Sequence, residues 1–471
     1  MASPRGFMFP TVFLALFLLV SCRPAGAYSV LTHEELIDLT WNDSIRPLLL
    51  KRFPNLTPAQ LKEAHAYAYG GCVIQDLGYY PFEKPLFSNF LHYVRTADFV
   101  RALFRESKDA DDVAFAIGAL SHYLGDTIGH ADAVNIAVGN EFPSLSAKYG
   151  PNVNYAEGEH QHVRVEFAFD VNNIVKHRLA PEKYLNHIGF AVPMPVLARA
   201  FYDTYGLDLA KVLHSPRPQV RGYRWAVRTL LPNVAYAEAI LYRKKMPPDV
   251  PSPALDGLNQ QIGEVAARDN WKGYRSHAGF GTYVLAGFIF VLPKVGPLSG
   301  LALRAPTPAS EQDYINALAA TTSELRHRLD QATRSGTLPN KDLDTGDIVY
   351  PGTYSLEDYA YVDLLHQMTL DPGSPVPFGI KRDLLAYFAD TSKVKYVQNN
   401  RKLLAQVQAD LPILKNISTK AEYPETALLP EPDADKPNPT VPTAPRTRSL
   451  SDSTGSPSAT AADAATPATQ P

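Results

Sequence analysis

The chain has 471 residues, of which 45% are hydrophobic and 20% charged, and its formal net charge is −3. That length suffices for one large domain or two, and the near-neutral charge gives no bulk electrostatic reason to expect a nucleic-acid-binding protein. Of the two cysteines, Cys22 lies in the leader described next, so Cys72 has no partner in the mature chain and no disulfide framework is expected.

The first residues predict export. Residues 11–21 form an unbroken apolar run behind Arg5, which is too short to span a bilayer and fits the hydrophobic part of a signal peptide. Cleavage after Ala27, in an A-x-A site, would make residues 1–27 the signal peptide and Tyr28 the first mature residue. Residues 19–22 instead resemble a bacterial lipobox, which would leave a lipid-anchored Cys22. The first route predicts a periplasmic or secreted protein, and the second an outer-membrane lipoprotein.

Helical patterns dominate the mature chain and predict an all-α fold. Thr32 and Glu35 have capping-box spacing and open the first predicted helix. Thr57 and Pro58 open a second, which a pair of glycines at residues 70–71 ends before a loop that carries Asp76. Further helical patterns cover residues 87–106, 109–138, 157–177, 310–334 and 395–414. From about residue 424 the chain is rich in Pro, Ala, Ser and Thr, which predicts a disordered tail.

The most informative motif is HYLGDTIGH, residues 122–130. In a helix, His122, Asp126 and His130 fall at i, i+4 and i+8 and therefore stack along one face. The apolar stripe is separate, because Leu124 lies about 200° around the helix from His122 at roughly 100° per residue. Imidazole and carboxylate groups suit a borderline cation such as zinc. The alternative is a helix with two surface histidines.

Further candidate ligands favour the metal interpretation. Glu159, His162, Glu166 and Asp170 recur at three- and four-residue steps on one face of the predicted helix over 157–177. The remaining candidates lie earlier in the chain: His33 in the first turn of its helix, Asp76 on the predicted loop, and His92 in the stretch over 87–106. Successive helices thus carry a set of ligand types, which predicts a metal cluster. His65 and His187 have no acidic neighbours at ligand spacing and are interpreted as ordinary histidines.

This arrangement resembles the zinc-dependent phospholipase C family, whose fold is shared by the S1/P1-type nucleases. The resemblance covers about residues 28–175 and lies in the order of the ligands: an N-terminal aromatic residue, His33, Asp76, His92, the H-x3-D-x3-H helix and a later H-x3-E helix. In that family the free amino group and carbonyl of the first mature residue bind zinc. Tyr28 matches that residue, which favours cleavage after Ala27 over the lipobox.

The resemblance implies a role for each residue. His33, Asp76, His92, His122 and Asp126 would hold a close zinc pair, with Asp76 bridging the ions or acting as the base. His130, Glu166 and His162 would hold a further zinc, so two or three ions are expected. His160 competes with His162, because both precede acidic residues. The H-x3-D-x3-H spacing looks more like the eukaryotic glycosylphosphatidylinositol-phospholipase D branch than the bacterial phospholipases.

The resemblance also implies a reaction. Zinc lowers the pKa of bound water to about 7 and can activate it to attack a phosphodiester. The expected enzyme is an exported zinc phosphodiesterase that acts on phospholipid at a membrane surface, with nucleic acid a less favoured substrate and no protein partner predicted. The alternatives are a secreted zinc nuclease of the same fold and a non-catalytic zinc-containing protein of the cell envelope.

The sequence predicts four parts: the signal peptide (1–27), a phospholipase C-like helical domain (28–250), a mostly helical region without an assigned role (251–423) and the tail (424–471). Two segments of the third part stand out. Residues 281–292 are the most apolar stretch of the mature chain, and a helix buried in the core is favoured over a membrane-contacting element. Asp342, Asp344 and Asp347 suggest a calcium loop but lack the EF-hand pattern, which favours a capped turn.

Overall fold

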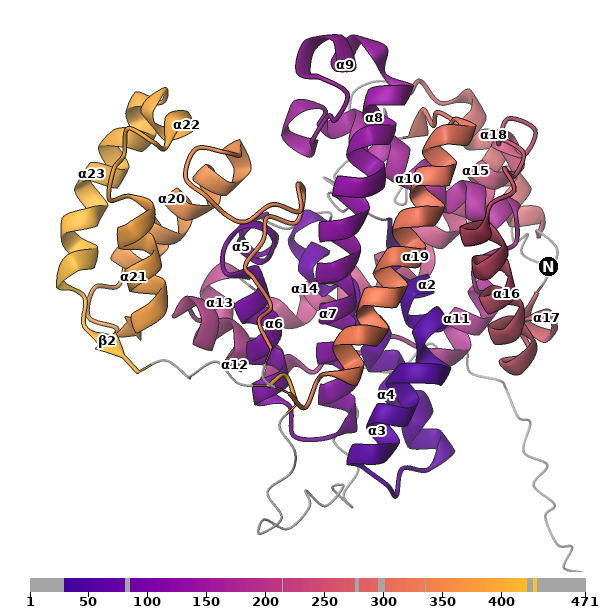
Figure 1. Ribbon diagram of the computed structural model, residues 1–471, viewed down its shortest axis with the longest axis horizontal. Helices are drawn as coiled ribbons and strands as arrows, with labels where there is room; N and C mark the ends of the chain where they lie inside the picture. Colours follow the sequence, from indigo (N-terminus) through magenta and orange to yellow (C-terminus); the bar gives the residue numbers. More distant parts are fainter. Residues whose placement is uncertain are drawn as a thin grey trace, which may run out of the picture.

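The computed structural model describes residues 29–80, 85–213, 215–275, 279–294, 301–334, 336–421 and 427–429. Within these residues nearly every regular element is a helix, which confirms the predicted all-α class (Figure 1). The predicted signal peptide, Cys22, Tyr28 and most of the predicted tail lie outside the described residues.

The first half of the chain contains helices α2 to α15 and short 3-10 and π-helical turns. The helices are α2 (Val30–Thr40), α3 (Arg46–Arg52), α4 (Pro58–Gly71), α5 (Leu86–Tyr93), α6 (Thr96–Glu106), α7 (Ala110–Gly129), α8 (Asn135–Glu141), α9 (Pro143–Tyr149), α10 (Glu159–Val175), α11 (Glu182–Ile188), α12 (Met194–Tyr205), α13 (Leu209–Val212), α14 (Pro216–Trp225) and α15 (Leu231–Tyr242). The turns are η2 (Trp41–Ile45), η3 (Ile74–Tyr79), η4 (His130–Val134), η5 (Tyr155–Glu157) and η6 (Ala226–Leu230).

The second half is also helical and carries two short strands. Its elements are α16 (Pro253–Arg268), α17 (Trp271–Tyr274), α18 (Phe280–Val291), α19 (Pro308–Asp330), α20 (Ser355–Thr369), β1 (Val376–Pro377), α21 (Phe378–Tyr387), α22 (Lys395–Gln398), α23 (Arg401–Asn416) and β2 (Thr419–Lys420). The strands pair in parallel, with Val376 opposite Thr419. Helices α20 to α23 lie at the far left of Figure 1, and α15, α16 and α18 at the right.

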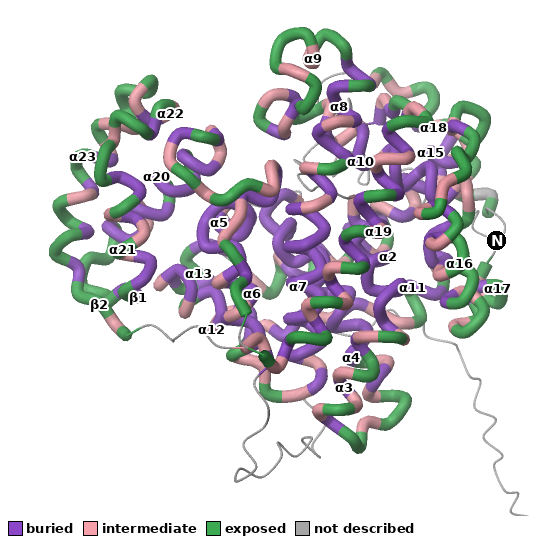
Figure 2. The backbone as a smooth tube through the Cα atoms, in the orientation of Figure 1, coloured by how far each residue is buried: buried purple, intermediate pink, exposed green. Residues whose placement is uncertain are grey.

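Helix α7 lies in the middle of the molecule, and nearly all of its residues are buried (Figure 2). Asp109 caps its start by accepting a hydrogen bond from the backbone N–H of Asp112. Helix α4 packs very closely on α7, because a Cβ on Gly118 would lie 2.2 Å from the carbonyl oxygen of Ala68. This contact brings the end of α4, and so Asp76 in the following 3-10 helix, against the middle of α7.

The helix predicted over 109–138 is present, with a local change at His130. Residues of η4 form a π-helical turn between α7 and α8, so the helical path continues to Glu141. A π-helical turn inserts one residue into the helix and is frequent at functional sites. His130 therefore stands where the helical register changes.

The capping box predicted at Thr32 is wrong. Helix α2 begins at Val30, and Ser29 in the N-cap position makes no side-chain cap. Asp170 of α10 caps the helix instead: its carboxylate accepts from the backbone N–H of Leu31 and of Thr32, both at 3.1 Å, and from the Thr32 hydroxyl at 2.6 Å. A carboxylate suits the free N–H groups at a helix start. It holds the start of α2 against α10.

The helical stretch over 87–106 is two helices. Helix α5 ends at Tyr93, Arg95 adopts a left-handed conformation (φ 50°), and α6 begins at Thr96. The Asn340 side chain, from far along the chain, accepts hydrogen bonds from the N–H of Ala97 and of Asp98. The break leaves His92 in the last turn of α5, facing α7.

The two halves share one hydrophobic core. Buried side chains of α19 and α20, such as Tyr314 and Leu365, belong to the same cluster as those of α2 and α7. Helix α19 runs alongside α7 (Figure 1). In the described part of the chain, no helix has the length and apolarity needed to cross a membrane.

Candidate metal centre

Eight of the nine predicted ligands lie in the described residues, and the structure brings all eight into three groups. In each group, one donor atom per residue lies within 4.8 Å of the others. The groups are His33–His122–Asp126, Asp76–His92–His122 and His130–His162–Glu166. The first two share His122 and together form the five-residue cluster; the third is the three-residue cluster. Tyr28 lies outside the described residues, and the role of all nine as ligands stays a prediction.

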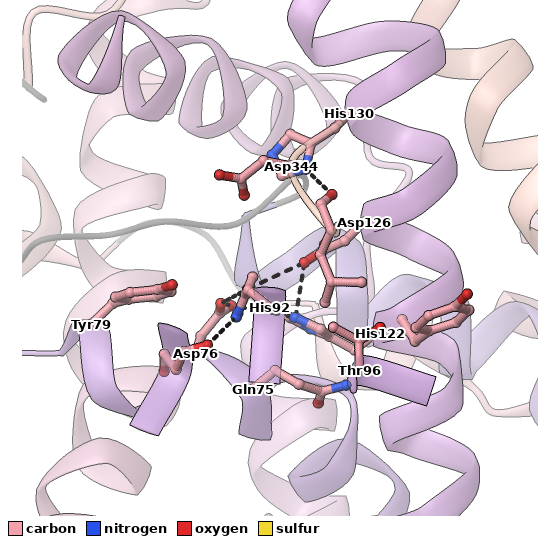
Figure 3. A network of polar contacts seen from close by, with 12 residues as sticks. Gln75, Asp76, Tyr79, His92, Thr96, His122, Asp126, His130 and Asp344 are labelled. Atoms are coloured by element: carbon pink, nitrogen blue, oxygen red, sulfur yellow. Dashed lines mark hydrogen bonds and ion pairs between the residues drawn. The ribbon is translucent and has the colours of Figure 1, made fainter. Parts of the chain in front are cut away.

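Asp126 is the centre of the five-residue cluster. Its Oδ1 lies 3.3 Å from Nε2 of His33, and its Oδ2 lies 3.0 Å from Nε2 of His122 and 3.5 Å from Nε2 of His92 (Figure 3). Asp76 approaches from the 3-10 helix, with Oδ1 3.3 Å from His92 Nε2 and 3.9 Å from His122 Nε2. Side chains from four elements thus point their donor atoms at one small volume.

Backbone carbonyls orient two of these rings. Nδ1 of His92 lies 2.8 Å from the carbonyl oxygen of Ser88, and Nδ1 of His122 lies 3.0 Å from that of Cys72. Because a carbonyl oxygen only accepts, Nδ1 carries the proton, and in the neutral ring Nε2 keeps a lone pair directed at the cluster. Ligand histidines in metalloproteins are held in this way.

Backbone carbonyls also orient the histidine rings of the three-residue cluster. Nε2 of His130 and Nδ1 of His162 lie 3.6 and 3.4 Å from Oε1 of Glu166. The other ring nitrogens face carbonyl oxygens, with His130 Nδ1 2.7 Å from Leu343 and His162 Nε2 2.9 Å from Val153. His160, the competitor of His162, is exposed.

Burial and neighbouring charges shift the pKa values of the cluster residues in different directions: burial, followed by His122, lowers the pKa of His33. Burial by itself would lower the pKa of His92, but Asp126 and Asp76 raise it well above the usual value. Burial would likewise lower the pKa of His130, which Glu166, followed by Asp344, raises to about 9. Burial would raise the pKa of Asp126, yet the neighbouring histidines, led by His122, hold it well below its usual range.

The donor set fits zinc. Imidazole nitrogens and carboxylate oxygens are ordinary zinc ligands. Nε2 of His92, of His122 and of His130 and Oδ1 of Asp76 are buried and make no hydrogen bond within the described residues. Buried polar atoms without partners are costly. Bound cations would satisfy them, in the five-residue cluster for His92, His122 and Asp76 and in the three-residue cluster for His130.

Other predicted candidates lie elsewhere. Glu159 is exposed, and Asp170 is used in capping α2. His65 is buried, with Nε2 3.7 Å from Asp38 and its ring stacked on Trp41, in keeping with an ordinary core histidine.

Sequence reasoning missed the loop after α19, in which Leu343 contacts the centre. The carbonyl oxygen of Leu343 accepts a hydrogen bond from Nδ1 of His130, and the neighbouring Asp344 is among the charges that raise the pKa of His130. The three aspartates of this loop were a visible signal, but nothing local in the sequence tied them to a helix more than 200 positions earlier.

Comparison with known proteins agrees with this geometry. Residues 32–214 match the family model described as zinc dependent phospholipase C. No curated protein and no solved structure matches the chain. All eight described candidate ligands fall within the matched residues. Over residues 32–214, the chain is therefore similar to the zinc-dependent phospholipase C family.

Proposed function

We propose that the protein is an exported zinc phosphodiesterase that hydrolyses phospholipids. The observation that carries the activity is the convergence of five buried imidazole and carboxylate side chains around Asp126, inside the region that matches the family. The five-residue cluster would hold a close pair of ions, and the three-residue cluster a third. Zinc, when bound, lowers the pKa of coordinated water to about 7 and offsets the charge of a phosphodiester.

The chain's own residues would position the reaction. Asp76 lies on a 3-10 helix rather than within a long α-helix, and its Oδ1 faces both His92 and His122. We assign it to orient the attacking water and to accept its proton. The buried surroundings of the cluster exclude bulk water, which strengthens each electrostatic contact.

The surface of α18 favours phospholipid over nucleic acid. This helix is not fully buried as expected: Ala286 and Ile289 pack into a core with α15, but Tyr283, Phe290 and Val291 are 58%, 73% and 71% exposed. Exposed aromatic and aliphatic side chains of this kind insert into the interface of a membrane.

Basic groups accompany these apolar side chains. The ammonium groups of Lys245 and Lys294 lie 4.6 and 5.4 Å from the centre of the Tyr242 ring, at the ends of α15 and α18. Lys244 beside them is exposed. Apolar and basic side chains together suit a membrane that contains anionic lipid.

A two-substrate assay tests the function. Purified zinc-loaded protein is incubated with phosphatidylcholine vesicles that contain anionic lipid and, separately, with single-stranded DNA. Release of lipid headgroup supports the proposal, and cleavage of DNA alone supports the nuclease. Bound zinc with no hydrolysis of either substrate supports the non-catalytic envelope protein.

A matched pair of variants tests the role of α18. Phe290→Ser should lower activity on vesicles about tenfold or more, because burying a Phe side chain contributes roughly 1.5–3 kcal/mol. It should leave hydrolysis of a soluble short-chain phospholipid unchanged. Phe378→Ser is the control, because Phe378 is 54% exposed at the start of α21, at the other end of Figure 1. Equal loss in both variants would remove α18 from the proposal.

Export is part of the proposal and has its own test. If Tyr28 is the first mature residue, its free amine and its carbonyl could chelate zinc beside His33. If Cys22 is acylated instead, the nitrogen of Tyr28 belongs to a peptide bond and cannot bind zinc as an amine does. Asp170 fixes residues 31 and 32 at the start of α2, which supports a defined position for the chain end. N-terminal sequencing of protein from its native envelope should find Tyr28, and an acylated Cys22 contradicts this.

A further inference from the structure

The loop between α19 and α20 lies against the end of α7. Residues 341–348, the 341–348 loop, are closed by an antiparallel bridge between Lys341 and Ile348. Gly346 has a φ of +74°, and a Cβ there would lie 2.3 Å from the carbonyl oxygen of Thr127, three residues before His130. Only glycine combines the left-handed conformation with so close an approach. The backbone of the loop is therefore packed directly against the helix that carries the central motif.

Leu343 is the contact between this loop and the metal centre. Its carbonyl oxygen accepts a hydrogen bond from Nδ1 of His130 at 2.7 Å, and its N–H donates to the carbonyl oxygen of His92, in the last turn of α5, at 3.0 Å. The first bond leaves Nε2 of His130 directed at Glu166, 3.6 Å away. Because the backbone of Leu343 makes both contacts, they depend on where the loop is held.

The side chain of Asp344 holds the loop in place. Its Oδ2 accepts hydrogen bonds from the hydroxyls of Tyr93, at the end of α5, at 2.8 Å and of Tyr354, just before α20, at 2.6 Å. Burial, followed by the charge of Asp344, raises the pKa of both tyrosines well above the usual value, so both hydroxyls keep their protons and donate. Asp344 is fully buried. Its carboxylate therefore joins the loop to two other segments.

The backbone of Asp344 is fixed as well. Its N–H donates to Oδ1 of Asp342 at 2.8 Å, and its carbonyl oxygen accepts from the side chain of Asn135 in α8 at 3.0 Å. The N–H, the carbonyl oxygen and the carboxylate of this one residue thus all have partners. Leu343 is the preceding residue, so its carbonyl group cannot turn away from His130 while these bonds persist.

We propose that Asp344 is a positioning residue for His130: it holds the 341–348 loop so that the carbonyl oxygen of Leu343 fixes the His130 ring. The proposal rests on the proposed zinc function. Groups that orient a metal ligand matter almost as much as the ligand, and their mutation typically weakens metal binding about 10–100-fold. The region after residue 250 then has a role, because it completes a metal centre whose ligands lie in residues 32–214.

Two substitutions of Asp344 test the role of its acceptor atoms. Asp344→Leu offers no acceptor to the tyrosine hydroxyls, whereas Asp344→Asn keeps one carbonyl oxygen but no charge. Competition with a chelator should show that Asp344→Leu binds one zinc per chain about tenfold more weakly or worse, and that Asp344→Asn restores most of the affinity. The zinc of the five-residue cluster should remain in both variants. Equal loss in the two variants would overturn the proposal, because charge and not position would then matter.

The ring proton of His130 gives a readout that does not depend on zinc. In the wild type the proton on Nδ1 is held in a buried hydrogen bond. Its NMR signal, identified by its absence in His130→Gln, should be protected from exchange with solvent both with zinc and after chelation. Asp344→Leu should lose this protected signal, and Asp344→Asn should keep it.

A matched pair of tyrosine variants separates positioning from general stability. Tyr93→Phe and Tyr387→Phe each remove a buried hydroxyl that donates to carboxylate oxygens, but the hydroxyl of Tyr387 donates to two carboxylates of α20. Tyr93→Phe should weaken one zinc by a smaller factor than Asp344→Leu, and Tyr387→Phe should leave zinc affinity unchanged. Equal loss of affinity in these two variants would overturn the positioning role.

The outcomes also distinguish this proposal from the proposed function. A wild type that binds no zinc would overturn the proposed function. A wild type that binds zinc, together with an Asp344→Leu variant that keeps both its zinc affinity and the protected His130 signal, would overturn only the positioning role of Asp344.

Discussion

His122 of α7 donates a hydrogen bond from Nδ1 to the carbonyl oxygen of Cys72, the residue that follows α4, at 3.0 Å. The bond exists because the two helices touch backbone to backbone at Gly118, one turn before His122 on the same side of α7. The packing of the two helices and the orientation of the His122 ring therefore depend on the same close contact.

Replacing Gly118 by Ala should destabilise the protein and weaken zinc binding together. The new Cβ would lie 2.2 Å from the carbonyl oxygen of Ala68 and 2.7 Å from the amide nitrogen of Cys72, so α4 must move away from α7. Overpacking of this kind costs about 1–3 kcal/mol. Urea unfolding and zinc titration of the variant measure the two effects.

Gly222→Ala is the control. Gly222 is an exposed residue within α14, and a Cβ there meets nothing within 4 Å. Alanine is the better helix former, so this variant should be stabilised by roughly 0.5–1 kcal/mol. A Gly118→Ala variant as stable as the wild type would refute the close packing.

Asp126→Asn should remove zinc from the five-residue cluster. Both carboxylate oxygens of Asp126 face imidazole nitrogens, and Asn provides no charge to balance the cations. Mutation of a residue that only orients a metal ligand lowers activity roughly 10–100-fold. Hydrolysis by Asp126→Asn should fall by more than this. Metal analysis and the headgroup-release assay give the two readouts.

The exposed Asp132, in the π-helical turn, supplies the comparison: Asp132→Asn should keep both zinc and activity. The fold of Asp126→Asn should survive, because the packing of α7 depends on apolar side chains such as Leu120 and Leu124. Unchanged zinc content in Asp126→Asn would exclude this residue as a ligand.

Chelation should lower the melting temperature, and added zinc should restore it. A ligand that binds only the folded state stabilises it by RT ln(1 + [L]/Kd), about 2.7 kcal/mol for an ion at 100 times its Kd. Magnesium should not replace zinc, because it prefers oxygen ligands and the clusters are rich in imidazole. Differential scanning calorimetry with and without EDTA checks this, and an unaffected melting temperature would contradict a metal-dependent fold.

Glu238 in α15 should make the protein less stable as the pH rises. Burial raises its pKa from 4.5 to about 7, although Lys294 and Lys245 act in the opposite direction. The folded state therefore holds a proton that the unfolded chain releases from about pH 4.5 upward. The stabilising contribution is complete below pH 4.5 and is lost as the pH rises to about 7, so the free energy of unfolding falls over that range.

Glu238→Gln should reduce this fall, by about 1–3 kcal/mol between pH 4.5 and 7.5. Urea unfolding at several pH values measures the difference from the wild type. Glu63→Gln serves as the comparison, because Glu63 is exposed in α4. Identical pH profiles for the wild type and Glu238→Gln would show that the carboxyl of Glu238 keeps its ordinary pKa.

Local spacing in the sequence was enough to anticipate much of the centre. The helical period alone places His122, Asp126 and His130 along one side of a helix, and the structure has them so. The helix start predicted at Thr57 and Pro58 is likewise confirmed, and there Thr57 forms a capping box with Gln60. These features depend only on neighbours within one or two turns.

What the sequence could not show depends on contacts between distant segments. Asp170, 138 positions from Thr32, caps the start of α2. The capping box predicted locally at Thr32 therefore does not form. The break at Arg95 is stabilised by Asn340, which no pattern near residue 95 could reveal. The sequence favours a capped turn for the loop that carries Asp342 and Asp344, and Asp342 does accept hydrogen bonds from the backbone N–H groups of residues 344 and 345. A local turn of this kind does not reveal which distant helix the loop packs against.

The bond between His130 and Leu343 joins residues 213 positions apart, and this sets an order of folding. Contacts between distant segments form slowly, because a long stretch of chain must be closed first. The ring of His130 acquires its carbonyl acceptor only when the segment after α19 has folded onto α7. We therefore expect the three-residue cluster to form late and to capture its ion only after the segment that follows α19 has folded.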